Sequence, residues 1–141
     1  MKFILDERLK QDSISILNLQ LCEVRLMNDK QYPWLVLVPQ RANCTEIIDL
    51  SLDEQSLLLA EIRLCCEEFK LRYPNHKLNV ANLGNVVSQL HLHIVARHSD
   101  DRAWPGPVWG AFPCEAYDQS VLAETVDALA NALKARATKL P

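Results

Sequence analysis

The chain has 141 residues, of which 49% are hydrophobic. This is enough for one compact domain with a buried core and too little for two ordinary domains. The chain has 15 lysine and arginine residues and 18 acidic residues, which gives a formal net charge of -3. This balance argues against an extended nucleic-acid-binding surface. No apolar run approaches the length that spans a bilayer, and the first ten residues contain too short an apolar stretch for a signal peptide. We therefore expect a single domain over residues 1–141, cytoplasmic and without membrane contact.

Cysteine usage gives no sign of a cross-linked or metal-bound framework. The five cysteines are an odd number and form no CxxC pair, so neither a disulfide scaffold nor a thiolate zinc site is expected. Cys65 and Cys66 are interpreted as packing residues, because no histidine lies near them in the sequence to activate a thiolate.

Two strands are predicted in the first forty residues. Residues 21–27 mix apolar and polar residues in near alternation, and residues 34–39 (WLVLVP) form a continuous apolar run. The polar stretch 28–33 between them ends in a proline and is typical of a hairpin connection. The two strands are therefore expected to be antiparallel neighbours.

A long helix is expected to begin after Ser51, because Ser51 and Glu54 have the spacing of a capping box. Apolar residues then recur at three- and four-residue steps and predict a buried stripe of Leu58, Ile62, Cys65 and Phe69. The charged residues fall largely elsewhere on the helical wheel and predict a solvent-facing side of Glu61, Arg63, Glu67, Glu68 and Lys70. Tyr73-Pro74-Asn75 is expected to end the helix.

The clearest strand signal lies in residues 88–97 (SQLHLHIVAR), after an extended segment at 77–80 and a glycine-containing loop at 82–85. Side chains alternate across a strand. The apolar face is expected to hold Leu90, Leu92, Ile94 and Ala96. The opposite face is expected to hold Gln89, His91, His93, Val95 and Arg97.

The last third of the chain predicts an ordered loop and a helix. Residues 100–113 contain two tryptophans and three prolines, too aromatic for a disordered linker. Four apolar residues then mark an amphipathic C-terminal helix, namely Leu122, Val126, Leu129 and Leu133. The element order β-β-α-β-β-loop-α predicts an α+β fold, a small antiparallel sheet with a central helix and a C-terminal helix.

Two of the four histidines, His91 and His93, lie two residues apart on the polar face of the predicted strand. Residues so spaced have Cβ atoms about 6.6 Å apart, so both rings can reach one phosphate group or one metal ion. Neutral imidazole is an effective nucleophile toward phosphorus and then a competent leaving group. Backbone N–H groups of a glycine-containing turn can stabilise charge on the phosphoryl oxygens.

The segment Gly84 to Val95 (GNVVSQLHLHIV) resembles the signature of the histidine triad (HIT) superfamily, a glycine-led turn running into an HxHxH strand. In this register the first histidine of the family falls on Gln89, the middle one on His91 and the third on His93, a QxHxH variant. A bacterial group of HIT-like hydrolases shares the QLHLH form and a downstream WPGPVWG stretch, here residues 104–110. The hairpin, the central helix and the strand before the motif extend the resemblance over most of the chain.

The resemblance implies a HIT-like fold and a nucleotide hydrolase or nucleotidyl transferase that cleaves at an α-phosphate. The implied substrates are dinucleoside polyphosphates or adenosine phosphoramidates. His91 would form a covalent nucleotidyl-histidine intermediate, His93 would help bind the phosphate, and the backbone carbonyl of Gln89 would orient His91. Substrate-binding roles are implied for Asn28, which resembles the family's ribose-binding residue, and for Asn79, Gly84 and Asn85. A homodimer is also implied, and no metal or other cofactor is required.

Departures from the family pattern motivate an alternative function. Asn85 stands where a glutamine is common, and Val86 stands where a hydroxyl residue often contacts the leaving group or phosphate. Together with Gln89, they favour a non-catalytic nucleotide-binding module as the second hypothesis.

Other interpretations of the histidines remain open at this stage. His91 and His93 could face solvent on an edge strand, or could bind zinc together with His98. The odd separation of His98 from the pair argues against the zinc site, because it turns His98 to the opposite face. His98 and His76 are interpreted as surface residues.

Several residues near the motif also have structural interpretations. Arg97 is expected to form a surface ion pair with Asp100 or Asp101. Trp104 and Trp109 are interpreted as covering the edge of the core in preference to stacking on a base. Asn79 satisfies backbone groups near a turn in one interpretation and orients substrate in the other.

Overall fold

The computed structural model describes residues 1–140, which form a five-stranded antiparallel sheet with three α-helices. In chain order the elements are α1 (Glu7–Asp12), β1 (Ser13–Asn18), β2 (Cys22–Met27), β3 (Trp34–Pro39), the 3-10 turn η1 (Ile47–Asp49), α2 (Leu52–Arg72), β4 (Lys77–Asn82), β5 (Leu92–Arg97) and α3 (Gln119–Ala137). The strand order is β1-β2-β3-β5-β4. Every neighbouring pair is antiparallel, which confirms the predicted α+β class.

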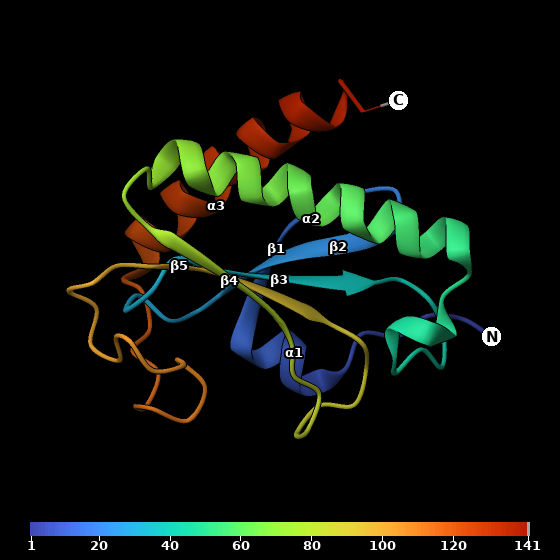
Figure 1. The fold of residues 1–141 in the computed structure, drawn as a ribbon, viewed down its shortest axis with the longest axis horizontal. Helices are drawn as coiled ribbons and strands as arrows, with labels where there is room; N and C mark the ends of the chain where they lie inside the picture. The colour runs from blue at the N-terminus through green and yellow to red at the C-terminus, as the bar shows by residue number, and fades with distance from the viewer. Residues whose placement is uncertain (141) are drawn as a thin grey trace.

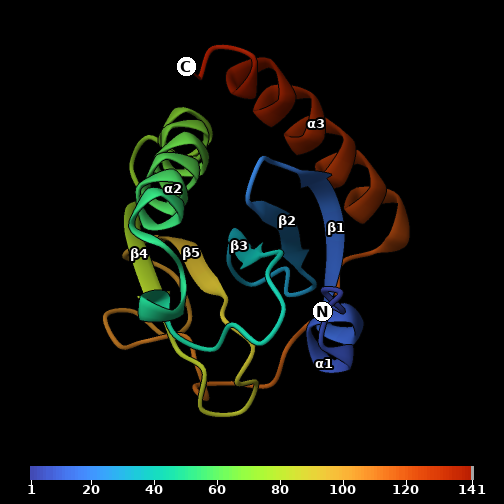
Figure 2. The ribbon, with the colours of Figure 1, turned by 90° about the vertical axis from the view of Figure 1, so that its right-hand side faces the viewer.

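The two faces of the sheet are covered differently (Figure 1). Helices α2 and α3 lie on one face, α2 over the β4–β5 side and α3 along β1, whereas α1 lies at the other face (Figure 2). The main core lies between the sheet and α2 and α3. A second apolar cluster lies on the face of α1 and includes side chains from β3, β5 and the loop that follows β5. No helix among residues 1–140 is long and apolar enough to span a bilayer.

The predicted hairpin and helices are present. Strands β2 and β3 pair in antiparallel register, with Val24 opposite Leu37. Helix α2 begins at the predicted capping box, where Ser51 Oγ accepts from the Glu54 N–H at 3.2 Å and the Glu54 carboxylate accepts from the Ser51 N–H at 2.9 Å. Helix α3 buries Leu129 and Leu133 against the main core.

The prediction for residues 88–97 is correct in its alternation and too long in its extent. Leu90, Leu92, Ile94 and Ala96 all belong to the main core, and Val95 lies in the cluster on the opposite face. The strand itself spans Leu92–Arg97, because the backbone before it turns away from the sheet and the Leu90 N–H bonds to the Cys44 carbonyl at 2.9 Å.

The solvent-facing assignment of α2 is wrong for two of its glutamates. Glu61 is fully buried, and its carboxylate accepts from the backbone N–H groups of Leu21 and Cys22 at 3.0 and 2.8 Å. Glu68 is buried between Arg72 and Arg136, which bond its two carboxylate oxygens at 2.9 and 2.8 Å. Each carboxylate is buried together with hydrogen-bond donors that offset the cost of removing its charge from water.

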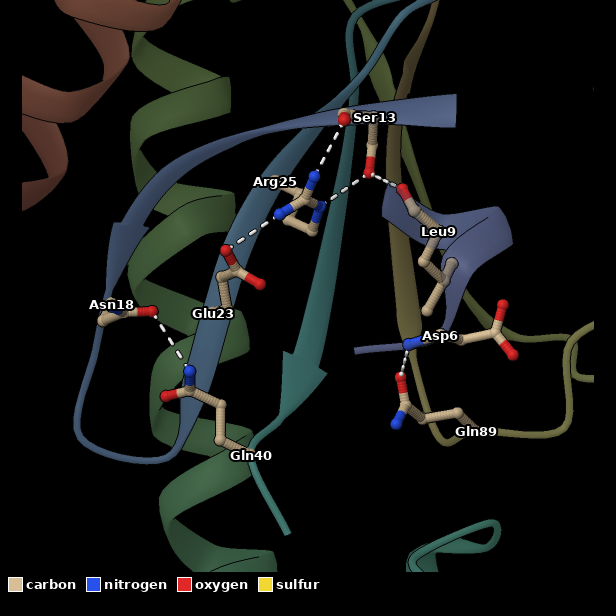
Figure 3. Close-up of polar contacts among 8 residues, drawn as sticks. All are labelled: Asp6, Leu9, Ser13, Asn18, Glu23, Arg25, Gln40 and Gln89. Atoms are coloured by element: carbon tan, nitrogen blue, oxygen red, sulfur yellow. Dashed lines mark hydrogen bonds and ion pairs between the residues drawn. The ribbon is translucent and has the colours of Figure 1, made fainter. Parts of the chain in front are cut away.

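Helix α1 and strand β1 were not predicted. Asp6 caps α1 by accepting from the Arg8 N–H at 2.8 Å, and β1 adds an edge strand beside β2. Ser13 joins the two elements, since its hydroxyl donates to the Leu9 carbonyl and accepts from Arg25 Nε at 2.7 Å (Figure 3). This N-terminal segment forms part of the site described next.

Candidate active site

His91 and His93 lie side by side at the start of β5, with ring centroids 4.8 Å apart. Both side chains are only 4% exposed, and β5 lies inside the sheet, between β3 and β4. The interpretation of two solvent-facing histidines on an edge strand is therefore wrong. The two imidazole rings are instead buried next to each other.

The orientation of His91 is fixed by the backbone of Gln89. His91 Nδ1 lies 2.7 Å from the Gln89 carbonyl oxygen. A carbonyl oxygen can only accept, so Nδ1 carries a proton. In the neutral form of the ring, Nε2 then has the lone pair and is the nitrogen available for nucleophilic attack.

The tautomer of His93 is fixed by Trp34. The Trp34 indole Nε1–H donates to His93 Nδ1 at 3.0 Å, and the indole nitrogen can only donate. Burial lowers the pKa of His93 to about 4, the His91 ring acts in the same direction, and a hydrogen bond to the Leu83 backbone opposes them. His93 is therefore neutral near pH 7, with its proton on Nε2.

Both histidines line a cavity of about 390 Å³. Its wall comes from α1, the end of β2, the loop before β5 and the loop after β5. It consists of Arg8, Leu9, Asp12, Met27, Asp29, Trp34, Leu83, Asn85, Val86, Val87, His91, His93, Val108, Trp109, Gly110, Phe112 and Cys114. The wall is largely apolar with a few polar groups, as in most small-molecule sites.

The structure brings part of the predicted site together. Asn85 lines the cavity with the two histidines. Gly84 lies in the same loop, where an added Cβ would be 3.1 Å from the Val87 carbonyl oxygen, so a side chain there would press against the backbone of the turn. The side chain of Gln89 lies outside the cavity wall, and only its backbone carbonyl contacts His91.

Two predicted substrate-binding residues point elsewhere. Asn28 Oδ1 accepts from the Tyr117 N–H at 3.0 Å, and the neighbouring Asp29 lines the cavity. Asn79 Oδ1 accepts from Arg97 Nη1 at 3.1 Å and does not line the cavity. Asn79 thus bonds a side chain and not the backbone groups of a turn.

The expected surface ion pair of Arg97 is a buried one. Arg97 is 1% exposed and meets both carboxylate oxygens of Asp101 at 2.7 and 3.0 Å. Its guanidinium also lies 5.7 Å from the ring centroids of Tyr32 and Trp104. This pair joins β5 to the loop that follows it, and neither residue lines the cavity.

The remaining aromatic and histidine residues divide between two places. Trp109 lines the cavity and meets the rings of Trp34 and His93 edge-on, so its role extends beyond covering the core. His98 and His76 are half-buried and outside the cavity wall, His98 with 39% of its side chain exposed, and they lie against each other with centroids 5.0 Å apart. Within residues 1–140, no group of three or more histidine, cysteine or acidic side chains could hold a metal ion.

The cavity residues that the sequence did not predict include Arg8, Asp29 and Trp34. The position of Trp34 could have been predicted from the sequence. Alternation along β3 places it on the same face as Val36 and Val38, away from the main core. The positions of Arg8 and Asp29 could not, because they lie far from the histidines in the sequence and reach the cavity only through tertiary packing.

Comparisons with known proteins agree with this geometry. The family model described as "HIT domain" matches residues 8–100. A crystal structure of a histidine triad (HIT) protein from Sinorhizobium meliloti 1021 is 41% identical, with a TM-score of 0.87 over 95% of this chain and 96% of that chain. Histidine triad proteins from Bradyrhizobium japonicum (42% identity, TM-score 0.91, covering 94% and 99%) and Marinobacter aquaeolei VT8 (40%, 0.92, 96% and 98%) are similarly related. No curated protein matches the chain.

The buried histidine pair, the antiparallel sheet that carries it and the matched family model identify the same group of proteins. This chain belongs to the histidine triad (HIT) family.

Proposed function

We propose that the chain is a nucleotide hydrolase or nucleotidyl transferase that cleaves at an α-phosphate through a covalent intermediate on His91. The observation that carries this proposal is the bond of His91 Nδ1 to the Gln89 carbonyl at 2.7 Å, because in the neutral ring it makes Nε2 the nitrogen with the free lone pair, beside a cavity of about 390 Å³. A buried imidazole fixed in this tautomer is suited to attack phosphorus.

In the proposed first step, the Nε2 lone pair of His91 forms a bond to the α-phosphorus. The bond from that phosphorus to the leaving group breaks, and its electron pair departs with the leaving group. In the second step a water oxygen, or the hydroxyl oxygen of another acceptor, forms a bond to the same phosphorus and releases a proton to solvent, while the N–P bond breaks and returns its electron pair to Nε2. Dinucleoside polyphosphates and adenosine phosphoramidates are the proposed substrates.

Neighbouring residues have separate proposed roles. His93 keeps its proton on Nε2 because Trp34 donates to Nδ1, and this neutral donor, which meets the Leu83 backbone in the structure, is proposed to bind a phosphate oxygen in its place. Asp29, not Asn28, is the proposed ribose-binding residue, since its buried carboxylate lines the cavity. The Gln31 and Glu115 N–H groups orient this carboxylate at 3.1 and 3.4 Å.

Kinetics and binding of a His91→Asn variant test this proposal. We expect turnover of diadenosine tetraphosphate and adenosine phosphoramidate to fall at least about a thousandfold, because the nucleophile is lost. Nucleotide affinity should remain within about threefold, since the amide retains polar contact. His98→Asn is the matched control, because His98 does not line the cavity, and it should turn over normally.

The same experiment decides between the enzyme and the second hypothesis. Tight nucleotide binding by the wild-type protein, with a trace of turnover that His91→Asn leaves unchanged, would indicate a non-catalytic nucleotide-binding module. The implied homodimer also stays a prediction, which analytical ultracentrifugation of the purified chain would test.

A further inference from the structure

The side chain of Gln89 clasps the chain segment that precedes α1. Its Oε1 accepts from the Asp6 N–H at 2.9 Å, and its Nε2 donates to the Ile4 carbonyl at 2.8 Å. Figure 3 shows Gln89 reaching Asp6 next to the start of α1. One amide thus satisfies a backbone donor and a backbone acceptor two residues apart, as a neighbouring strand would.

The clasped segment is ordered by more than this contact. Phe3 and Leu5 pack against the apolar cluster that contains Leu9 and Trp34. The Asp6 side chain caps α1 by accepting from the Arg8 N–H. Residues 3–9 are therefore fixed to the active-site face of the sheet, and residues 3–7 precede the HIT domain match, which begins at residue 8.

Helix α1, which follows this segment directly, forms one wall of the cavity. Arg8, Leu9 and Asp12 of α1 line it together with His91 and His93. Arg8 is the one lysine or arginine in the lining, and its guanidinium forms no ion pair or hydrogen bond within residues 1–140. A cation with no protein partner on the wall of a phosphate site is available for a phosphate oxygen.

We propose that Gln89 is a positioning residue that clasps the segment before α1 through its side chain, so that Arg8 binds the phosphates beyond the α-phosphate. This inference rests on the proposed function, because it names the group that receives the polyphosphate end of that substrate. It assigns two tasks to Gln89, since its carbonyl orients His91 and its amide holds the wall that faces His91.

The clasp itself is tested without any nucleotide. Gln89→Leu keeps the backbone carbonyl and the approximate volume but removes both side-chain hydrogen bonds. We expect the Asp6 amide to exchange its hydrogen at least about tenfold faster in Gln89→Leu than in wild type, because its acceptor is lost. Unchanged protection at Asp6, with melting temperatures that show both proteins folded, would overturn the clasp.

The role of Arg8 is tested by binding of α,β-methylene-ATP, which cannot be cleaved at the α-phosphorus, and of AMP. We expect Arg8→Ala to weaken the triphosphate analogue about five- to tenfold and AMP less than about twofold, because a charge-assisted contact to the outer phosphates is lost. Lys10→Ala is the matched control, since Lys10 lies on α1 outside the cavity wall. It should bind both ligands as wild type does.

A double-mutant cycle connects the two observations. If Gln89 positions Arg8, then Arg8→Ala should cost about twofold or less in the Gln89→Leu background. An equal cost in both backgrounds, or an equal loss for AMP and the triphosphate analogue, would overturn the inference. Failure of the wild-type protein to bind either nucleotide would instead contradict the proposed function, and the role of Arg8 with it.

Discussion

Trp34 determines which nitrogen of His93 carries the proton. Its indole N–H donates to His93 Nδ1 at 3.0 Å. If Nδ1 were protonated, its N–H would face the indole N–H, and the hydrogen bond would be lost. Burial and the nearby His91 ring already hold the pKa of His93 at about 4. A neutral His93 therefore adds no positive charge beside His91 near neutral pH.

Trp34→Phe should raise the pKa of His93 by about one pH unit, because the donor that opposes protonation of Nδ1 is lost while the ring volume is nearly kept. The acid limb of the pH–rate profile should move to higher pH by the same amount. Nitrogen-15 NMR titration of the His93 ring measures the change directly.

Trp109→Phe is the matched control. Trp109 also meets His93 edge-on, but its indole nitrogen has no hydrogen-bond partner among residues 1–140. A pKa shift of equal size in both variants would contradict this account.

At the scale of elements, Glu61 joins helix α2 to the turn between β1 and β2. Its carboxylate accepts from the N–H groups of Leu21 and Cys22. Two charge-assisted hydrogen bonds from a fully buried carboxylate offset its desolvation. The contact therefore fixes the position of the β1–β2 turn relative to α2. Strand β1 follows directly after α1, which lines the cavity.

Glu61→Ala should lower the free energy of unfolding by about 2–3 kcal/mol, because two buried backbone donors lose their acceptor. Chemical denaturation followed by circular dichroism measures the loss. Glu67→Ala on the same helix should change it by about 0.5 kcal/mol or less, since the Glu67 ion pairs are solvent-exposed. An equal effect of the two substitutions would show that the buried bonds of Glu61 do not stabilise the fold.

The sequence predicted the elements whose formation depends on neighbouring residues along the chain. The capping box of Ser51 and the alternation from Leu90 to Ala96 need only neighbouring residues, and both are present in the structure. Strand β1 and the burial of Glu61 depend on contacts with α3 and with the β1–β2 turn. The site divides in the same way: the motif placed His91 and His93 together, whereas Arg8 reaches the cavity only through tertiary packing.

For the whole molecule, the buried neutral His93 makes stability depend on pH. Its pKa is about 4 in the folded protein against 6.5 as the ordinary value. The unfolded chain therefore binds more protons between these values, and stability is lost as pH falls from about 6.5 to about 4. The loss should reach about 3 kcal/mol at most, and His76, whose pKa burial also lowers, acts in the same direction.

His93→Gln removes this titration. Its free energy of unfolding should depend less steeply on pH across the same window than that of the wild-type protein, which urea denaturation at a series of pH values measures. His76→Gln, a histidine outside the cavity, should flatten the dependence less. Parallel curves for wild type and His93→Gln would rule out His93 as the source.

The central claim, that His91 is the nucleophile, is tested most directly by mass spectrometry of the intact protein after quenched mixing with adenosine phosphoramidate or diadenosine tetraphosphate. We expect an adenylyl adduct on the wild-type protein, mapped to His91 by proteolysis, and no adduct on His91→Ala. Substrate hydrolysis that continues unchanged in His91→Ala, with no adduct on either protein, would contradict the covalent mechanism.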